Sequence, residues 1–567
     1  MRKIYSLVLM ATMLLMGTNV KAVDVENWSE LSDALSGSAT EITLTQNISM
    51  PEDGQISITG GKSLVLNLNG FSIAHNPSQA SITAKTATSY PILLDGGNLT
   101  INGNGTISST YYAVVKVVGS YYDVANYSVM TVKQGVNMTS EGSYAFVVAQ
   151  AKVPGTTSNS NHGYGIVINF DGTLTASGDE GTAFWVLGNI KDTEGNIPQI
   201  IIGPHAVLTG ADNGVGYYAG GYAENTIQGS VSGGAGIYAK AGEITIDGGH
   251  ITATSTTYSN PTANGNGFSG GMGCAIVSDS HKGYQGEMEI VIKGDATIGT
   301  SATEGYAIKE VVTDNNNQTK TESLIIEGGT INGDLNTTAE LKENIILNGT
   351  ITGGTYSGNV SDYINPAATD LVETSPGSGV YTVKVAVDVT LNGSGYATFS
   401  AKKNVELPTS GLAVWKATEL SGTNLVVEAV AGTVIPANTG VILVGEANGQ
   451  FTLTETPTAA SAITDNLMKP ATAWSASYVG NAYILHDNEL WLYTGNEFKA
   501  NKAFFVFSGS SAAPKRLRMV LNQTETPTAV ENVETQNVKA VKFVGEDGQL
   551  YIRRGEAVYT VQGQVVK

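Results

Sequence analysis

The sequence predicts an all-β protein whose larger part is a parallel β-helix, and two observations support this fold class. Charged residues make up only 14% of the 567 residues, and 68 residues are glycine, a composition that favours extended structure over disorder because strand-forming residues are also abundant. The phrases "IIEGGTING" (325–333), "TIDGGHITATS" (245–255) and "ILNGTITGGTYSG" (346–358) share one pattern, in which aliphatic residues flank glycine.

Units of this kind recur along the chain, which is typical of a solenoid. Glycine between two short strands lets the backbone turn a corner, and the flanking aliphatic side chains then stack on those of neighbouring coils. A globular β-sandwich is the alternative, but regularly spaced Asn-Gly hairpin signals are missing. The first aliphatic residue of each unit is expected in the core: Ile101, Val132, Ile168, Ile202, Ile227, Ile246, Ile292, Ile326 and Ile346. In most units a second aliphatic follows five or six positions later: Ile107, Leu174, Ile251, Ile298 and Ile331.

Residues 1–22 have the features of a secretory signal peptide. Arg2 and Lys3 precede an apolar run (4–16), and Val20 and Ala22 resemble the small-residue pattern of a cleavage site. No later apolar run approaches the roughly 20 residues that span a bilayer, so no transmembrane segment is expected. The single cysteine, Cys274, is predicted to be a buried thiol, and it excludes an internal disulfide framework. The expected location is secreted or at the cell surface, without a lipid-anchor cysteine.

The remaining chain divides by composition. Short alternating strands with Pro and Gly punctuation follow the predicted β-helix and indicate a β-sandwich, and a polar, acidic linker precedes two or three final strands. The expected organisation is a β-helix (23–385), a β-sandwich module (386–521), a linker (522–535) and a short C-terminal β tail (536–567).

Several of these segments resemble known families. "NWSELSDAL" (27–35) with "ITLTQNISM" (42–50) resembles the capping helix and first coil of right-handed parallel β-helices of the pectin-lyase-like superfamily, and "ITGGTYSGNVSDYI" (351–364) resembles the phrase that closes such domains. "GYATFS" (395–400) and "ANKAFFVFSG" (500–509) are similar to a β-sandwich module of secreted Bacteroidetes proteins. The resemblance implies an adhesin-like secreted protein, with a tail like the sorting tails of that phylum.

Net charge and the absence of known motifs disfavour nucleic-acid binding and several classes of enzyme. The net charge of −20 disfavours nucleic acid as a partner, because phosphate binding needs a basic surface. No arginine lies between Lys3 and Lys515, whereas enzymes that act on uronate polymers usually bind the carboxylate with arginine. The polygalacturonase-like set of motifs is also missing, and the six histidines lack metal-ligand spacing. We therefore expect no catalytic residues, no cofactor and no metal ligands, although a structural calcium in a loop stays open.

One aromatic constellation suggests a ligand site. Seven strands align, the first being "YYAVV" (111–115) and the last "GYAIK" (305–309), with Val114 and Ile308 expected to face the core and Val115 and Lys309 to face outward. Among them are "GTAFW" (181–185), "GVGYY" (214–218) and "GAGIY" (234–238), and the alternation of strand residues turns their last side chains outward. Trp185, Tyr218 and Tyr238 are therefore predicted to form a ladder that stacks against sugar rings. The alternative is that loops such as 155–163 or 255–272 cover this face and the ladder is packing.

The sequence thus predicts an exported, non-catalytic surface protein that binds extracellular glycan or matrix. Two other functions stay open: a carbohydrate-active enzyme of unrecognised type, either a polysaccharide lyase or a glycoside hydrolase, and a structural spacer.

Overall fold

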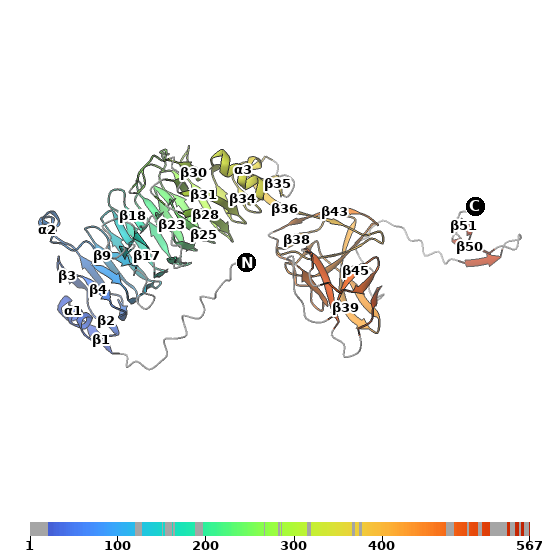
Figure 1. Cartoon of the computed structure of the whole chain (residues 1–567), viewed down its shortest axis with the longest axis horizontal. Coiled ribbons are helices and arrows are strands. Elements are labelled where there is room, and N and C mark those ends of the chain that lie inside the picture. Colours follow the sequence, from blue (N-terminus) through green and yellow to red (C-terminus); the bar gives the residue numbers. More distant parts are fainter. Residues whose placement is uncertain are drawn as a thin grey trace. The chain divides into compact units, whose positions relative to one another are not determined.

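The computed structural model is an all-β chain that divides into two compact units, residues 1–385 and 386–567 (Figure 1). Within the described residues, no helix is long and apolar enough to cross a membrane. The predicted signal peptide and linker lie almost entirely outside the described residues. The structure describes residues 21–521 apart from gaps at 120–126, 150, 153–160, 163–164, 188–196, 266, 282–283, 285, 315–318, 366–368, 374–376, 457, 472–480, 496–497, 500 and 508–512, and then residues 541–544, 550–554, 557–560 and 566.

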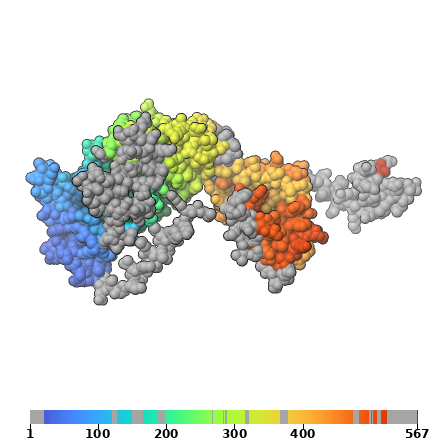
Figure 2. All heavy atoms as spheres, in the orientation of Figure 1, coloured from blue at the N-terminus to red at the C-terminus, as the bar shows by residue number. Residues whose placement is uncertain are grey.

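The first unit is a parallel β-helix of three-sided coils. Coils inside the stack each give one strand to each of three sheets, and these strands pair in parallel with the equivalent strands of the coils before and after. The colours in Figure 2 run in sequence order from blue to yellow along this unit, as expected when each coil contacts its neighbours in the chain.

The strands of the three sheets follow one another in chain order. Sheet A has eleven strands: β1 (Ala22–Val25), β2 (Glu41–Leu44), β5 (Ser63–Asn67), β8 (Asn98–Asn102), β11 (Ser128–Val132), β16 (Ile166–Phe170), β19 (Gln199–Ile202), β22 (Glu224–Ile227), β25 (Gly242–Asp247), β28 (Gly286–Lys293) and β31 (Thr319–Ile326). In this unit sheet B contains β3 (Ile48–Met50), β6 (Ser72–His75), β9 (Gly105–Ser109), β12 (Val136–Ser140), β17 (Thr173–Ala176), β20 (Val207–Thr209), β23 (Ser230–Gly233), β26 (His250–Ala253), β29 (Thr297–Thr300), β32 (Thr330–Asn332) and β34 (Thr355–Tyr356). Sheet C has ten strands: β4 (Ile56–Thr59), β7 (Ile92–Asp95), β10 (Val115–Val118), β13 (Tyr144–Ala149), β18 (Thr182–Val186), β21 (Val215–Ala219), β24 (Ala235–Ala239), β27 (Cys274–Ser280), β30 (Tyr306–Val312) and β33 (Asp334–Asn336). A small hairpin of β14 (Ala151–Lys152) and β15 (Asn161–His162) lies apart from these sheets.

Helices lie at both ends of the coil stack. Helix α1 (Trp28–Ser36) begins at Asn27, whose side chain accepts a hydrogen bond from the Glu30 backbone N–H. This confirms the capping helix expected over 27–35. Helix α3 (Ala339–Asn348) lies at the yellow end of the unit in Figure 1, beside β31, and a short 3₁₀ helix, η3 (Ser361–Tyr363), follows it. Helix α2 (Gln79–Ala84) buries none of its residues.

The predicted aliphatic core is largely confirmed, with one correction. Paired residues of sheet A form one buried column: Ile42, Leu66, Ile101, Val132, Phe170, Ile202, Ile227, Ile246, Ile292 and Ile326. Ile168 is buried two positions before Phe170, in the adjacent inward column. Ile346 is wrong as a strand residue, because it lies in α3, and Ile351 instead forms the bridge to Ile326.

The glycine pairs serve the corners in two ways. Gly248 has a φ of +80°, a backbone conformation that other residues adopt only with strain. A Cβ atom on the next residue, Gly249, would lie 2.8 Å from the Ile227 carbonyl oxygen of the neighbouring coil. This pair thus combines one left-handed residue with one close approach between coils. In the pairs at 328–329 and 353–354 the second glycine is the left-handed one, with φ values of +88° and +99°.

The second unit contains two sheets that pack as in a β-sandwich, around cores that include Trp415, Tyr483 and Phe399. The larger sheet has nine strands: β37 (Tyr396–Phe399), β39 (Leu412–Ser421), β40 (Asn424–Val430), β42 (Val441–Gly445), β44 (Met468–Ala471), β45 (Asn481–His486), β46 (Glu489–Leu492), β47 (Lys502–Phe507) and β48 (Arg516–Leu521). The smaller one is formed by the second part of β36 (Tyr381–Thr390), β43 (Gln450–Glu455), β38 (Val405–Glu406) and β41 (Val434–Ile435). The first part of β36 belongs to the first unit, where it pairs with β35 (Thr369–Glu373). The tail forms three antiparallel strands: β49 (Val541–Val544), β50 (Leu550–Arg554) and β51 (Ala557–Thr560).

Replacing Ile246 with Asp tests the inward column. The Ile246 side chain is fully buried between Ile227 and Ile292, so a carboxylate there has no charged partner and should lower the free energy of unfolding by several kcal/mol. Calorimetric melting measures the loss. Thr245→Asp, one position away on the partly exposed face, is the matched control and should melt nearly as the parent does. Equal melting of parent and Ile246→Asp would contradict the inward assignment.

Candidate functional site

The three predicted aromatic residues do lie side by side on the outer face of sheet C. Trp185 pairs with Tyr218, which pairs with Tyr238 on the next strand. The ring centroids of Trp185 and Tyr218 are 4.1 Å apart and the rings are stacked, and those of Tyr218 and Tyr238 are 6.2 Å apart. The strand alignment from sequence therefore placed these three residues in register.

The expectation that these rings face solvent is wrong, because residues 255–272, here called the covering loop, fold over them. Trp185, Tyr218 and Tyr238 are 5%, 1% and 0% exposed. The centroid of the Phe268 ring, in the covering loop, lies 6.3, 6.3 and 5.9 Å from theirs. This is the packing alternative that the sequence left open. A sugar could reach the rings only if the covering loop moved, and their ligand-binding role stays a prediction.

A buried polar network holds the covering loop down. The Lys240 ammonium lies 3.3 Å from the Asp279 carboxylate, with both side chains fully buried, and donates to the Asn264 backbone carbonyl at 2.5 Å. Asp279 also accepts hydrogen bonds from the hydroxyls of Tyr238 (2.9 Å) and Thr313 (2.6 Å). Burial lowers the pKa of Lys240, and the neighbouring Asp279 opposes that shift. Removing either charge would leave the other buried and unpaired, so this cluster is a structural clamp.

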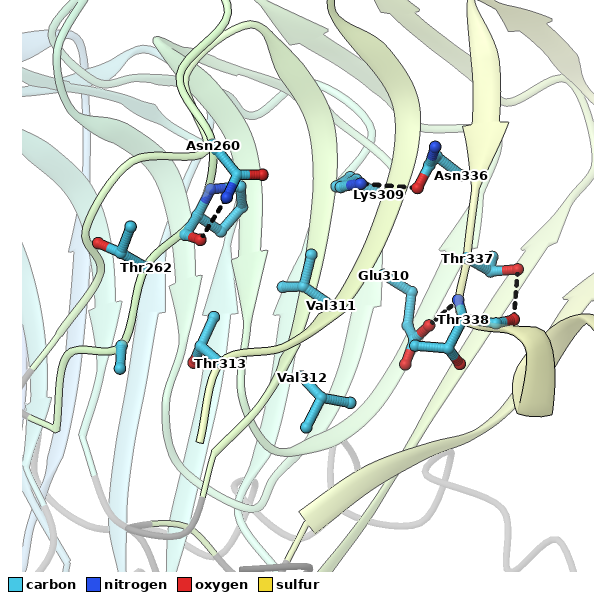
Figure 3. Close-up of a pocket in the computed structure, with 12 residues that line it drawn as sticks. Asn260, Thr262, Lys309, Glu310, Val311, Val312, Thr313, Asn336, Thr337 and Thr338 are labelled. Atoms are coloured by element: carbon cyan, nitrogen blue, oxygen red, sulfur yellow. Dashed lines mark hydrogen bonds between the residues drawn. The ribbon is translucent and has the colours of Figure 1, made fainter. Parts of the chain in front are cut away.

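A groove opens beside the covering loop at the last coils. It has a volume of about 590 Å³ and lies between the covering loop, strand β30 and the segment after β33. Figure 3 shows Asn260 and Thr262 of the covering loop on one side, and Asn336, Thr337 and Thr338 on the other. Its lining comprises Asn260, Pro261, Thr262, Ala263, Lys309, Glu310, Val311, Val312, Thr313, Asn336, Thr337 and Thr338. We call this space the Glu310 groove.

The charged groups of the Glu310 groove are held by their neighbours. The Lys309 ammonium donates to the Asn336 side-chain oxygen at 2.6 Å and lies 4.9 Å from the centroid of the Tyr306 ring. Glu310 is 5% exposed, and its carboxylate accepts a hydrogen bond from the Thr338 backbone N–H at 2.6 Å. Burial raises the pKa of Glu310, and the hydrogen bonds from Thr338 oppose that shift. The groove thus presents one carboxylate, one ammonium, amides and hydroxyls in fixed positions.

An inward column of sheet C becomes polar as it reaches this groove. Its members in earlier coils are apolar, and the last two are Ser278 and Glu310, both buried. In chain order the paired residues are Leu94, Val117, Val148, Val186, Ala219, Ala239, Ser278 and Glu310. Polar groups are costly in a solenoid core, so their concentration at the last coils marks this region as a candidate site.

The strands aligned from the sequence end at Lys309, one residue before Glu310. The alignment reached Lys309 in "GYAIK" and left out Glu310, although the change from Val and Ala to Ser and Glu at the next aligned positions was readable. In its first strand (111–115) the alignment is displaced by one residue, because Val115, and not Val114, pairs with Phe146. Lys116 therefore takes the outward position that had been given to Val115.

Two smaller expectations concern cysteine and metal ligands. Cys274 is buried, as predicted, and burial raises the pKa of its thiol to about 11, which suits an unreactive group. Among the residues that the structure describes, no three His, Cys, Asp or Glu side chains are grouped so that they could hold a metal ion.

No protein-family model, curated protein or solved structure matches the chain, so the function is inferred from the residues of the site.

Trp185→Ala tests whether the ladder is packing. The indole contacts Tyr144, Tyr218 and Phe268 beneath the covering loop, so truncation should lower the free energy of unfolding by roughly 3 kcal/mol, as for other buried aromatic residues. Thermal melting measures this. Trp491→Ala, at a side chain that is 43% exposed, is the control and should have a small effect. If the Trp185→Ala protein were as stable as the parent, the packing role of the three rings would be contradicted.

Glu310→Gln tests the burial of the carboxylate through pH. Since the folded-state pKa of Glu310 is raised, ionisation destabilises the fold; the cost is absent at acidic pH and is fully present once the pH exceeds the folded-state pKa. Glutamine removes that cost, so the variant should be more stable than the parent near neutral pH, by roughly 1 kcal/mol, and the gain should vanish in acid. Melting across pH measures the difference. Glu304→Gln, exposed on the same coil, should show no such trend. A constant difference would contradict the proposed ionisation.

Proposed function

We propose that the protein is an exported, non-catalytic surface protein that binds extracellular carbohydrate in the Glu310 groove. The observation that carries this proposal is the chemistry of the groove's lining. Amide, hydroxyl, carboxylate and ammonium groups together can both donate to and accept from sugar hydroxyls. Pro261, Val311 and Val312 supply apolar surface for the C–H faces of a sugar ring.

Rigid support for the binding groups favours recognition of a specific ligand. Lys309 and Asn336 are joined by a hydrogen bond, and Glu310 is fixed by the backbone of Thr338, the residue that caps α3. Groups held in place before a ligand arrives lose little conformational entropy when they bind it. The resemblance of the sequence to adhesin-like pectin-lyase-like proteins of Bacteroidetes supports the same class of ligand, although a fold alone does not determine function.

A binding role is favoured over hydrolysis or elimination. Glycoside hydrolysis commonly uses two carboxyl groups about 5–9.5 Å apart, and among the described residues that line the Glu310 groove only Glu310 has one. Uronate lyases usually bind the substrate carboxylate with arginine, and residues 4–514 contain no arginine. We therefore expect no unsaturated product, followed by ultraviolet absorbance, when the purified protein is incubated with uronate polymers. A rising absorbance would instead support the enzyme alternative.

A glycan array with the purified protein tests the binding role, with bound glycans also checked for breakdown. We expect binding to a restricted set of glycans without cleavage. Asn336→Ala should weaken that binding about tenfold, because it removes a groove amide and frees Lys309. Asn332→Ala, on sheet B of the same coil, is the matched control and should bind as the parent does. An array without bound glycans, or binding that Asn336→Ala leaves unchanged, would contradict the proposal.

A further inference from the structure

A second hollow adjoins Glu310. It has a volume of about 550 Å³, within the size range of small-ligand sites, and shares Glu310, Val312 and Thr338 with the Glu310 groove. Among the described residues that line it, four are acidic and none is basic. Its lining comprises Ser280, Glu310, Val312, Asp314, Thr321, Glu322, Thr338, Glu340, Leu341 and Asn344. We call it the acidic hollow.

Ser280 gives an independent sign that the acidic hollow takes a ligand. Its side chain is 3% exposed, lines the hollow, and its hydroxyl has no hydrogen-bond partner among the described residues. Ser278, two residues earlier on β27, is by contrast paired with the Thr321 hydroxyl at 2.5 Å. An unpaired buried hydroxyl is unfavourable, and a ligand that pairs with it would remove that cost.

The charges around Glu310 favour a cationic ligand. Glu340 lies near enough to raise the pKa of Glu310 further, after the larger effect of burial. The nearby cation, Lys309, is directed to Asn336 and the Tyr306 ring in the Glu310 groove. The Glu310 and Glu340 carboxylates therefore repel each other, and a positive charge placed between them would relieve the repulsion. Asp314 already lies 3.9 Å from the Nε2 atom of His281.

The spacing of the acidic groups suits an organic cation better than a metal ion. The described residues hold no cluster of three His, Cys, Asp or Glu side chains arranged as metal ligands. A primary ammonium group carries three hydrogen-bond donors on a larger body, and it can use carboxylate and hydroxyl acceptors that lie farther apart. Glu310 and Ser280 are acceptors of these two kinds.

We propose that the acidic hollow binds the ammonium group of an amino sugar, with Glu310 and Ser280 as its acceptors. This inference rests on the proposed function and narrows it to glycans that contain an unacetylated hexosamine. Since the hollow and the Glu310 groove share residues, one oligosaccharide can place its amino group in the hollow and further sugar rings in the groove. N-acetylation removes the charge and adds bulk, so the acetylated form of the same glycan should bind more weakly.

Isothermal titration at about pH 7 tests the inference with two probes, the β-1,4-linked tetramer of glucosamine and its fully N-acetylated counterpart. We expect the amino form to bind at least tenfold more tightly. Glu310→Gln should remove most of that difference, and Glu304→Gln, an equal change of charge on the exposed surface, should keep it. A preference that Glu310→Gln leaves intact would reflect the overall negative charge and would overturn the site.

Ser280→Ala separates binding from stability. It should weaken binding of the amino tetramer about threefold or more while leaving the melting temperature equal to that of the parent or higher, because it removes an unpaired hydroxyl. Unchanged affinity would overturn the role of Ser280. Equal binding of both tetramers would overturn the amino-sugar inference and leave the proposed function standing. The same conclusion would follow if neither tetramer bound while the glycan array showed binding of neutral glycans. Failure of both tetramers together with an empty array would overturn the proposed function as well.

Discussion

Stacking of equivalent side chains in register between successive coils is the constraint on which the first unit depends. The sheet A column that contains Ile246 continues through ten paired strands from Ile42 to Ile326. A coil can bury its aliphatic face only against the coils beside it, so pairing and burial are satisfied together. The corners carry no such constraint, and loops of different length can leave the helix there.

The two features with functional interest arise where this stacking is interrupted. The covering loop leaves the corner between β26 and β27 and buries an aromatic face under Phe268, with the Lys240–Asp279 pair as its clamp. Beyond it, the inward column turns polar at Ser278 and Glu310, next to α3. Apolar stacking ends in this column of sheet C, while the sheet A column continues to Ile326, and the Glu310 groove and the acidic hollow lie at the polar residues.

The architecture was predictable because its signal repeats, and the site was not because it occurs once. Ile101, Ile246 and Ile326 could be placed in the core from spacing alone. Ile346 could not, because a helix whose end is set by Gly349 replaces the expected strand. The exposure of Trp185 depended on whether a distant loop covers it, and no local pattern reports that. Only the three-dimensional structure shows that Ser280 and Glu310 line the same hollow.

Hydrogen–deuterium exchange, followed by mass spectrometry with and without a bound oligosaccharide, tests the central claim most directly. If carbohydrate binds where the coil stack becomes polar, protection should appear in peptides from β30 (306–312) and from residues 336–344, with smaller changes at 260–263. Protection confined to the second unit, or to sheet A far from these coils, would contradict the account.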